Sequence, residues 1–255
     1  MSELDDSKMP LLDHLIELRT RLLRSFLALA IAFGISIYFA RPIFAFLVQP
    51  LLASGQTKLI YTAIFEAFFV EIKVAFFAAS FFSFPVFATQ LWRFVAPGLY
   101  AKEKRAFLPF LLATPILFTL GAAMAYFMAI PVALNYLLGF GGNIGGVEQQ
   151  ALPGVDNYLN FVMKFIFGFG ISFLLPVLLM LLERAGIVTL KQLKGARRYA
   201  IVGAFAIAAV LTPPDIVSQL LLAIPLCILY ELALVAIWIT HRRKRSSEPV
   251  EESTA

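Results

Sequence analysis

Apolar residues in this chain gather into six segments that are separated by short polar stretches. Four of the segments have 24 residues or more, and a run of about 20 apolar residues matches the thickness of a bilayer. Lipid offers no hydrogen-bond partners to the backbone, so such segments must be helices. The pattern therefore predicts an all-α integral membrane protein with six transmembrane helices, at about residues 25–40, 67–91, 106–138, 157–182, 200–211 and 216–239.

The residues before the first segment predict a different helix. Plotted at about 100° per residue, residues 10–24 place leucines on one face and charged side chains on the other, which is typical of an amphipathic helix. We expect residues 1–24 to lie at the cytoplasmic surface. Glu17 is one turn from Arg21, and such a pair stabilises a helix by ~0.2–0.5 kcal/mol; a pair and a binding role for Glu17 both stay open. Arg19 falls on the apolar face, where its side chain would extend to lipid phosphate.

The fifth segment is too short to cross an undeformed bilayer. Its 12 residues rise about 18 Å, whereas a hydrocarbon core is roughly 30 Å thick. Either this helix tucks behind its neighbours or the bilayer thins around it. Residues 212–215 predict a capping box, in which Thr212 and Asp215 satisfy the first N–H groups of the sixth helix. Prolines interrupt the other long segments, so we expect kinked helices that enclose a concave face.

Charge distinguishes the two sides of the predicted membrane domain. Seventeen of the 21 Lys and Arg residues lie in residues 1–24, in the second and fourth loops and in the tail, residues 240–255. The first loop carries two, and the third and fifth carry none. Positive residues concentrate on the cytoplasmic side, so both termini are predicted to be cytoplasmic. The acidic N-terminus is not typical of a secretory signal. We therefore expect a multi-pass protein of the bacterial plasma (inner) membrane.

Composition narrows the possible functions. Hydrophobic residues make up 60% of the 255 positions, and the loops are short, so residues 1–255 are expected to form a single membrane domain. The net charge of +5 comes from basic residues beside the spans and not from a folded basic face, which argues against nucleic-acid binding. The one cysteine, Cys227, lies in the last segment, so neither a disulfide nor a metal site is expected.

Two carboxylates stand where the pattern favours other residues. Glu103 is the one acid among the basic residues of the second loop, and balancing charge or binding a ligand are both open for it. Glu231 lies roughly at mid-depth of the last segment with no obvious partner at that depth. A carboxylate there is energetically costly and is a candidate functional residue. A protonated side chain that bonds a neighbouring helix is the alternative.

The chain lacks the motifs of an enzyme. Its two histidines, His14 and His241, lie at opposite ends, and no nucleophile, zinc or nucleotide motif occurs. We therefore expect neither enzymatic activity nor a cofactor. A secondary solute transporter remains an alternative, but it would favour an internal repeat and paired charges at the midplane, and the sequence shows no convincing repeat.

Short motifs occur in order along nearly the whole chain, and together they resemble the TatC family, the six-span subunit of the twin-arginine protein translocase. No single motif is decisive, but their order and spacing are specific. They are HLIELR at 14–19, QPL at 49–51, EAF at 66–68, FVAPGLY at 94–100 with EKR at 103–105, AYF at 125–127, LTPPD at 211–215 and AIP at 223–225.

The resemblance implies a receptor that binds the twin-arginine signal peptides of folded cargo proteins and draws on the proton-motive force. It places the signal-peptide site at Glu17, Arg19, Phe94 and Glu103. It also implies self-association and single-span partner subunits, whose helices we expect to dock beside Thr212 and Gln219, where polar groups bond across helices. The remaining residues that match the family's motifs are Pro50, Glu66, Phe68, Pro97, Tyr126 and Asp215.

One residue departs from the family's pattern. The family often has a polar or acidic residue two positions before the proline of the fourth span, and this chain has Leu174 before Pro176. Glu231 is a candidate substitute for that missing intramembrane polar group.

Overall fold

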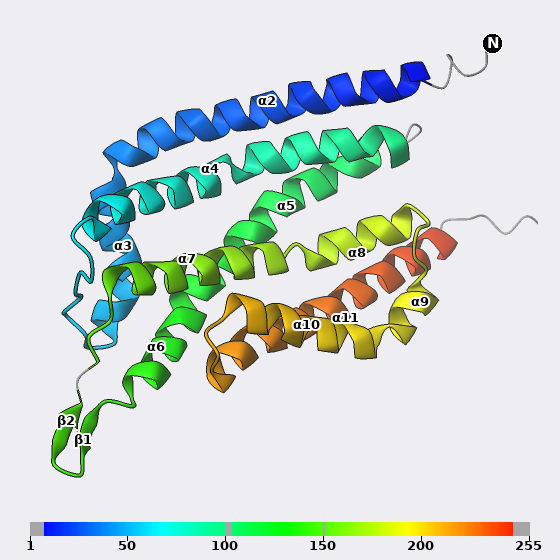
Figure 1. Cartoon of the computed structure of the whole chain (residues 1–255). Coiled ribbons are helices and arrows are strands. Elements are labelled where there is room, and N and C mark those ends of the chain that lie inside the picture. Colours follow the sequence, from blue (N-terminus) through cyan, green and yellow to red (C-terminus); the bar gives the residue numbers. More distant parts are fainter. Residues whose placement is uncertain (1–7, 100–103, 150, 247–255) are drawn as a thin grey trace, which may run out of the picture. The chain divides into compact units, whose positions relative to one another are not determined.

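The computed structural model describes the backbone of residues 8–99, 104–149 and 151–246 and the side chains of residues 15–94, 110–141 and 151–242 (Figure 1). Most of the described residues are helical, as the apolar pattern predicts. The elements in chain order are α2 (Lys8–Tyr38), α3 (Ala40–Ala53), α4 (Glu66–Leu99), α5 (Lys104–Met124), a π-helical turn (Ala125–Ala129), α6 (Ile130–Leu138), the strands β1 (Gly142–Ile144) and β2 (Val147–Gln149), α7 (Val155–Ser172), α8 (Leu175–Arg184), α9 (Leu190–Gly195), α10 (Arg197–Leu211) and α11 (Ile216–Ser246).

Five helical segments of the described chain are long and apolar enough to cross a membrane. This supports a multi-pass membrane protein. The fifth predicted span, 200–211, lies in α10, whose 15 residues rise only about 22 Å, so its crossing of the bilayer stays a prediction. The five segments are Leu15–Tyr38, Glu66–Phe94, Phe110–Leu138, Val155–Arg184 and Ile216–Arg242.

Contacts between Cα atoms divide the chain into two compact units. The first contains Met1–Ile116 and Tyr126–Met163, so it holds α2, α3, α4, most of α5, and α6. The second contains Leu117–Ala125 and Lys164–Ala255, and it holds the end of α5, the second half of α7, and α8 to α11.

In the first unit, α3 is a helix that the charge map treats as part of a loop. Its buried residues include Leu47 and Leu51. Two tyrosine hydroxyls donate to carbonyls of α3: Tyr126 to Phe46 O at 2.7 Å and Tyr158 to Leu47 O at 2.8 Å. The rings of Tyr126 and Phe46 also stack, with centroids 4.4 Å apart. This α3 is held by side chains 80 and 111 positions away, which sequence periodicity does not reveal.

In the second unit, two glycines allow close packing of aromatic side chains. A Cβ atom built on Gly121 would lie 2.6 Å from Phe169 O and 2.8 Å from the ring of Phe173. One built on Gly170 would lie 2.7 Å from the ring of Phe118. Small residues at such positions let membrane helices approach closely. The pairing of glycine with phenylalanine therefore positions α5 against α7.

Several spans are interrupted, as the prolines predict. The π-helical turn precedes Pro131 in the third span, and a turn of two residues, 173–174, separates α7 from α8 just before Pro176. A π-helical turn widens the helix by one residue. Leu174, the departure from the family's pattern, lies in the interruption of the fourth span.

The predicted capping box at residues 212–215 is wrong. Thr212 ends α10, and its Oγ1 donates to Ala208 O at 2.9 Å within that helix. The cap of α11 is Asp215, whose Oδ1 accepts from Ser218 N at 2.7 Å. The backbone of Thr212 is extended because a residue that precedes proline is disfavoured in the helical region. The two prolines therefore stay outside α11, and the cap moves to the next residue.

Candidate functional site

Glu17 on α2 is bound to a guanidinium in this structure. Its Oε1 accepts from Arg21 Nη2, one turn further along the helix, which is the pair that the spacing predicts. Arg21 Nη1 also donates to the backbone oxygen of Gln90 on α4 at 3.4 Å. The Arg21 side chain is 17% exposed and that of Glu17 is 39% exposed. Arg21 therefore joins α2 to α4, which lie side by side in Figure 1.

Gln90 adds a feature that sequence reasoning missed. Its side-chain Oε1 is buried and has no hydrogen-bond partner in the described structure. Buried polar atoms are normally paired, so an orphaned acceptor marks a place where a donor can be received. The sequence could have pointed to Gln90 through its spacing, because Gln90 is one helical turn before Phe94 and the two share a face of α4.

Of the remaining residues in the predicted signal-peptide site, the structure describes Arg19 and Phe94. Phe94 lies near the end of α4, and Arg19 is exposed on α2. Glu103 lies outside the described residues, and Pro97 lies in the last turns of α4, where side chains are not described. Trp92 donates from Nε1 to Thr114 Oγ1 at 2.8 Å and so ties this end of α4 to α5. The structure thus brings together the helices that carry Glu17, Arg19 and Phe94.

Glu66 organises the opposite end of α4. Its side chain is buried, and its Oε2 accepts from the backbone N of Thr62 and Ala63 and from Thr62 Oγ1. Its Oε1 accepts from Asp156 N at 2.9 Å at the start of α7. Asp156 in turn pairs with Lys73 of α4. Glu66 therefore bonds the first turn of α7 and the loop that precedes α4, which gives this motif residue a structural role.

Two other motif residues, Pro50 and Phe68, lie in α3 and at the start of α4. Pro50 is buried in α3, and its carbonyl accepts from Ser54 Oγ at 2.9 Å at the end of that helix. Phe68 is largely exposed on α4 and meets the ring of Phe69 edge to face.

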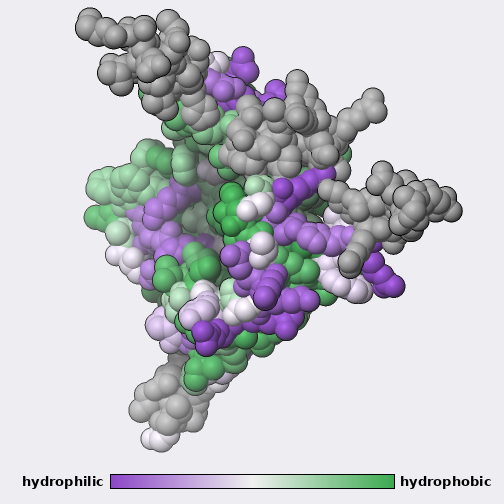
Figure 2. All heavy atoms as spheres, turned by 90° about the vertical axis from the view of Figure 1, so that its right-hand side faces the viewer, coloured by the Kyte–Doolittle hydropathy of each residue, from purple (hydrophilic) through white to green (hydrophobic). Residues whose placement is uncertain are grey.

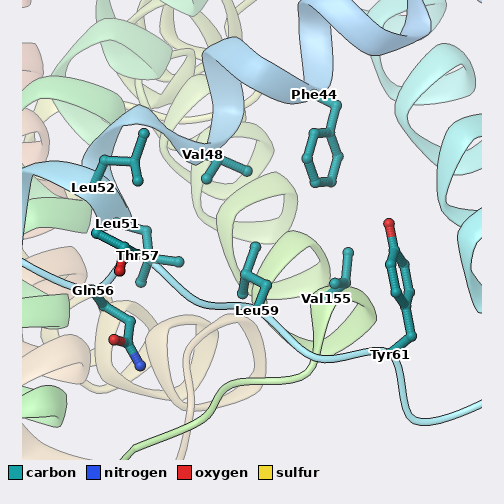
Figure 3. Close-up of a pocket in the computed structure, with 9 residues that line it drawn as sticks. All are labelled: Phe44, Val48, Leu51, Leu52, Gln56, Thr57, Leu59, Tyr61 and Val155. Atoms are coloured by element: carbon teal, nitrogen blue, oxygen red, sulfur yellow. The ribbon is translucent and has the colours of Figure 1, made fainter.

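A cavity of about 220 Å³ opens between α3, the following loop and the start of α7 (Figure 3). Side chains of α3 such as Phe44 and Val48 form its apolar wall, and the polar ends of Gln56 and Tyr61 lie at its margin. Gln56 Nε2 also donates to Ala151 O. The described residues hold no cluster of three or more His, Cys, Asp or Glu side chains that could bind a metal ion.

The polar groups predicted to dock partner helices are bonded within the α10–α11 pair. Thr212 is buried and bonds its own helix, and Gln219 Nε2 donates to Phe205 O at 3.3 Å. Between them lie two buried oxygens that have no partner in the described structure, Asp215 Oδ2 and Ser218 Oγ. This region of the second unit therefore retains unused hydrogen-bonding capacity.

The expectation that Glu231 lacks a partner at its depth is wrong. Its Oε2 accepts from Arg197 Nη2 at 2.8 Å, and both side chains are about half exposed. The neighbouring Tyr230 donates from its hydroxyl to Leu193 O at 2.7 Å. Because α10 is short, its first residue lies beside the middle of α11. Two adjacent residues of α11 thus hold the end of α9 and the start of α10.

Comparisons with known proteins agree on one family. A family model described as "Sec-independent protein translocase protein (TatC)" matches residues 13–225. The Sec-independent protein translocase protein TatC of Magnetococcus marinus is 45% identical over 250 residues, which cover 97% of this chain and 91% of that protein. The protein of that name from Aquifex aeolicus is 42% identical over 240 residues, covering 93% of this chain and 98% of the relative.

A solved structure is similar to this chain over most of the length of both. It is described as the crystal structure of "Twin Arginine Translocase Receptor- TatC", and it matches with a TM-score of 0.79 at 42% identity, covering 89% of this chain and 99% of that one. None of these relatives is named as a solute transporter.

Proposed function

Because this chain belongs to the TatC family of Sec-independent protein translocase proteins, we propose that it is the signal-peptide receptor and core subunit of a twin-arginine translocase. It binds twin-arginine signal peptides of folded cargo at its cytoplasmic face and assembles with single-span subunits and further copies of itself. The proton-motive force drives export. One observation carries the proposal: Glu17 already holds a guanidinium beside α4.

The proposed topology has six spans and two cytoplasmic termini in the bacterial plasma membrane. The distribution of basic residues supports it, because 17 of 21 fall on one side when α10 is counted as the fifth span. Residues 1–24 then lie at the cytoplasmic surface, which places Glu17, Arg19, Phe94 and Glu103 where a signal peptide arrives before export.

Arginine is better suited than lysine to a site of this kind. A guanidinium offers a planar fork that binds a carboxylate through two parallel hydrogen bonds, which an ammonium cannot match. An exposed pair contributes only ~0.2–1 kcal/mol. Useful affinity therefore requires partial burial and contacts to the apolar part of the peptide, for which Phe94 and the adjoining face of α4 are suited.

Arg21 acts as the internal occupant of Glu17 until a peptide binds. A guest arginine that takes the Glu17 carboxylate displaces Arg21 Nη2, while Arg21 Nη1 keeps its contact with Gln90 O. The unpartnered Oε1 of Gln90 is then the acceptor that receives the released guanidinium. The exchange preserves the number of hydrogen bonds and so lowers the cost of opening the site.

Photocrosslinking in native membranes tests the receptor function. Probes at positions 94 and 103 are presented with a twin-arginine signal peptide and, as control, with the twin-lysine peptide. Arginine-dependent crosslinks are expected at both positions. Glu103→Ala should weaken binding more than Lys102→Ala, which changes a neighbouring charge of opposite sign. Equal crosslinking of the two peptides, or equal effects of the two substitutions, would refute the site.

The outer ends of α10 and α11 are the proposed dock for single-span partner helices. The unpartnered Asp215 Oδ2 and Ser218 Oγ near Thr212 and Gln219 support this placement, because a polar residue of a partner can bond there. Gln219→Leu is expected to reduce crosslinking to the partner subunits. Intact crosslinking in that variant would count against the dock.

A further inference from the structure

The short helix α9 and the start of α10 carry a cluster of basic side chains and meet α11 at Tyr230–Ile237. We name the basic corner by its residues, Lys191, Lys194, Arg197 and Arg198, which belong to α9 and the start of α10. The Arg197–Glu231 ion pair fixes its position along α11. Glu231 is 15 residues from the start of α11 and 11 residues from Arg242, so its partner Arg197 lies at a level about 22 Å along the helix from one and about 16 Å from the other.

The corner is held firmly in this recessed position. Thr189 and Gln192 form a capping box at the start of α9, and the Tyr230 hydroxyl donates to Leu193 O near its end. Leu190 and Leu193 pack towards α11 in a core with Leu234 and Ile237, which turns Lys191 and Lys194 outward. The basic side chains are therefore presented by a rigid element.

Three of the four cations have no carboxylate partner in the described part of the chain. Glu231 neutralises Arg197 alone. Arg198 donates from Nη2 to the Tyr199 hydroxyl at 2.9 Å, and its guanidinium lies 4.7 Å from the centroid of that ring. Lys191 and Lys194 make no ion pair with a described side chain. The corner therefore carries an uncompensated positive charge.

The surroundings of the corner are apolar and exposed. On α10, Val202 and Val210 are among the most exposed hydrophobic residues. On α11, Leu232, Val235 and Trp238 are about half exposed between the corner and Arg242. Side chains of this kind face lipid in a multi-pass membrane protein. Figure 2 looks at the end of the molecule where α11 ends, and hydrophilic residues gather there beside hydrophobic ones.

The corner thus combines positive charge that described carboxylates do not neutralise with neighbouring side chains that are suited to lipid. Cations beside lipid-facing helices are costly at hydrocarbon depth. A short helix is accommodated when the bilayer thins locally, which brings headgroups to its end. Anionic headgroups would then supply the missing negative charge, and Tyr199 is an aromatic residue suited to the interface.

We propose that the basic corner binds the phosphate of an anionic phospholipid headgroup. Lys194 and Arg198 contact the phosphate, the Tyr199 ring lies beside the headgroup, and the acyl chains run along the exposed face of α10. The charge of the corner favours a lipid with net negative charge over a zwitterionic one. The site depends on insertion in a membrane and not on signal-peptide binding.

Lipid binding to the full-length chain tests the proposal. The protein, freed of lipid in a neutral detergent, is titrated with phosphatidylglycerol, with phosphatidylcholine or with inorganic phosphate, and the complexes are counted by native mass spectrometry. The Lys194→Gln/Arg198→Gln double variant is compared with Arg41→Gln/Lys58→Gln, which removes two exposed cations from another part of the chain. Thermal unfolding of all variants, followed by dye labelling of the single thiol Cys227, verifies that they are folded.

The corner variant should bind phosphatidylglycerol about 30-fold more weakly than the unsubstituted protein, at about fivefold for each basic residue near an anionic lipid. The Arg41→Gln/Lys58→Gln control should change this affinity by less than threefold by the same reasoning, since its cations lie elsewhere. Equal affinity for phosphatidylcholine, equal effects of the two double variants, or saturation by inorganic phosphate alone would each overturn the proposal. The last outcome would indicate a free-anion site instead of a lipid site.

Discussion

Replacement of Gln90 by leucine should raise stability and lower signal-peptide affinity. Leucine has nearly the same volume, and the backbone oxygen that accepts from Arg21 is unaffected. The substitution removes the buried Oε1 that has no partner. A buried acceptor left unsatisfied costs about 1–3 kcal/mol, so the unliganded variant is expected to gain roughly 1 kcal/mol, because Gln90 as a whole is only half-buried.

The effect on binding has the opposite sign. When a guest arginine takes Glu17, Arg21 needs the Gln90 Oε1 as its new acceptor, and leucine cannot provide it. A hydrogen bond to a charged group contributes about 1.5–3 kcal/mol, which corresponds to a signal peptide bound about 10- to 150-fold more weakly.

The two effects are measured on one preparation. Thermal unfolding in detergent is followed through the thiol of Cys227, and affinity for a fluorescent twin-arginine peptide is measured by anisotropy. Gln219→Leu serves as the matched control, because Gln219 Nε2 is bonded to Phe205 O and its loss should not stabilise the protein. A Gln90→Leu variant that binds peptide normally refutes the exchange of Arg21 between Glu17 and Gln90. A variant that also loses stability shows that the Gln90 side chain is bonded in the folded protein.

Three further predictions concern packing and polar contacts. Gly121→Ala should lower stability by about 1–3 kcal/mol because its Cβ would meet Phe169 and Phe173, whereas Gly203→Ala, with open space around it, should leave the melting temperature equal or higher; equal losses would contradict the close approach. Substitution of Arg197 and Glu231 by alanine, singly and together, should show a coupling of about 0.2–1 kcal/mol in a double-mutant cycle of thermal unfolding, because both side chains are about half exposed, and additive effects would exclude the ion pair. Glu66→Gln should lower the melting temperature and speed hydrogen exchange at the start of α7, since the amide binds donors less strongly than the carboxylate; unchanged exchange would argue against this role.

The features that could be predicted from sequence are those set by near neighbours along the chain. Apolar runs identify the long helices because lipid forces backbone groups to bond within each segment. The Glu17–Arg21 pair follows from helical spacing alone, and the structure confirms it. The shortness of α10 also follows from counting residues before the prolines, while its crossing of the bilayer stays a prediction. The motif order likewise identified the family that the comparisons confirm.

Other features depend on residues that only the folded chain brings together. The partner of Glu231 is 34 positions away, and a charge map that assigned Arg197 to a loop could not anticipate the contact. Glu66 meets Asp156 from 90 positions away, and α3 is held by two distant tyrosine hydroxyls.

The cap of α11 was misassigned for a local reason. Motif spacing identified a Thr and an Asp three apart but did not account for the extended backbone that the prolines impose on Thr212.

Sequence by itself determined that this chain is a multi-pass helical protein of the TatC family, because hydrophobic length and motif order are properties of the chain read in one dimension. Tertiary structure alone decided which polar groups are satisfied. It pairs Arg197 with Glu231, leaves the Gln90 Oε1 without a donor in the described structure, and packs the lysine-bearing α9 against α11. Hydrogen bonds and charges act over a few ångströms in space, whatever the separation along the chain, so their partners are set only when the helices pack.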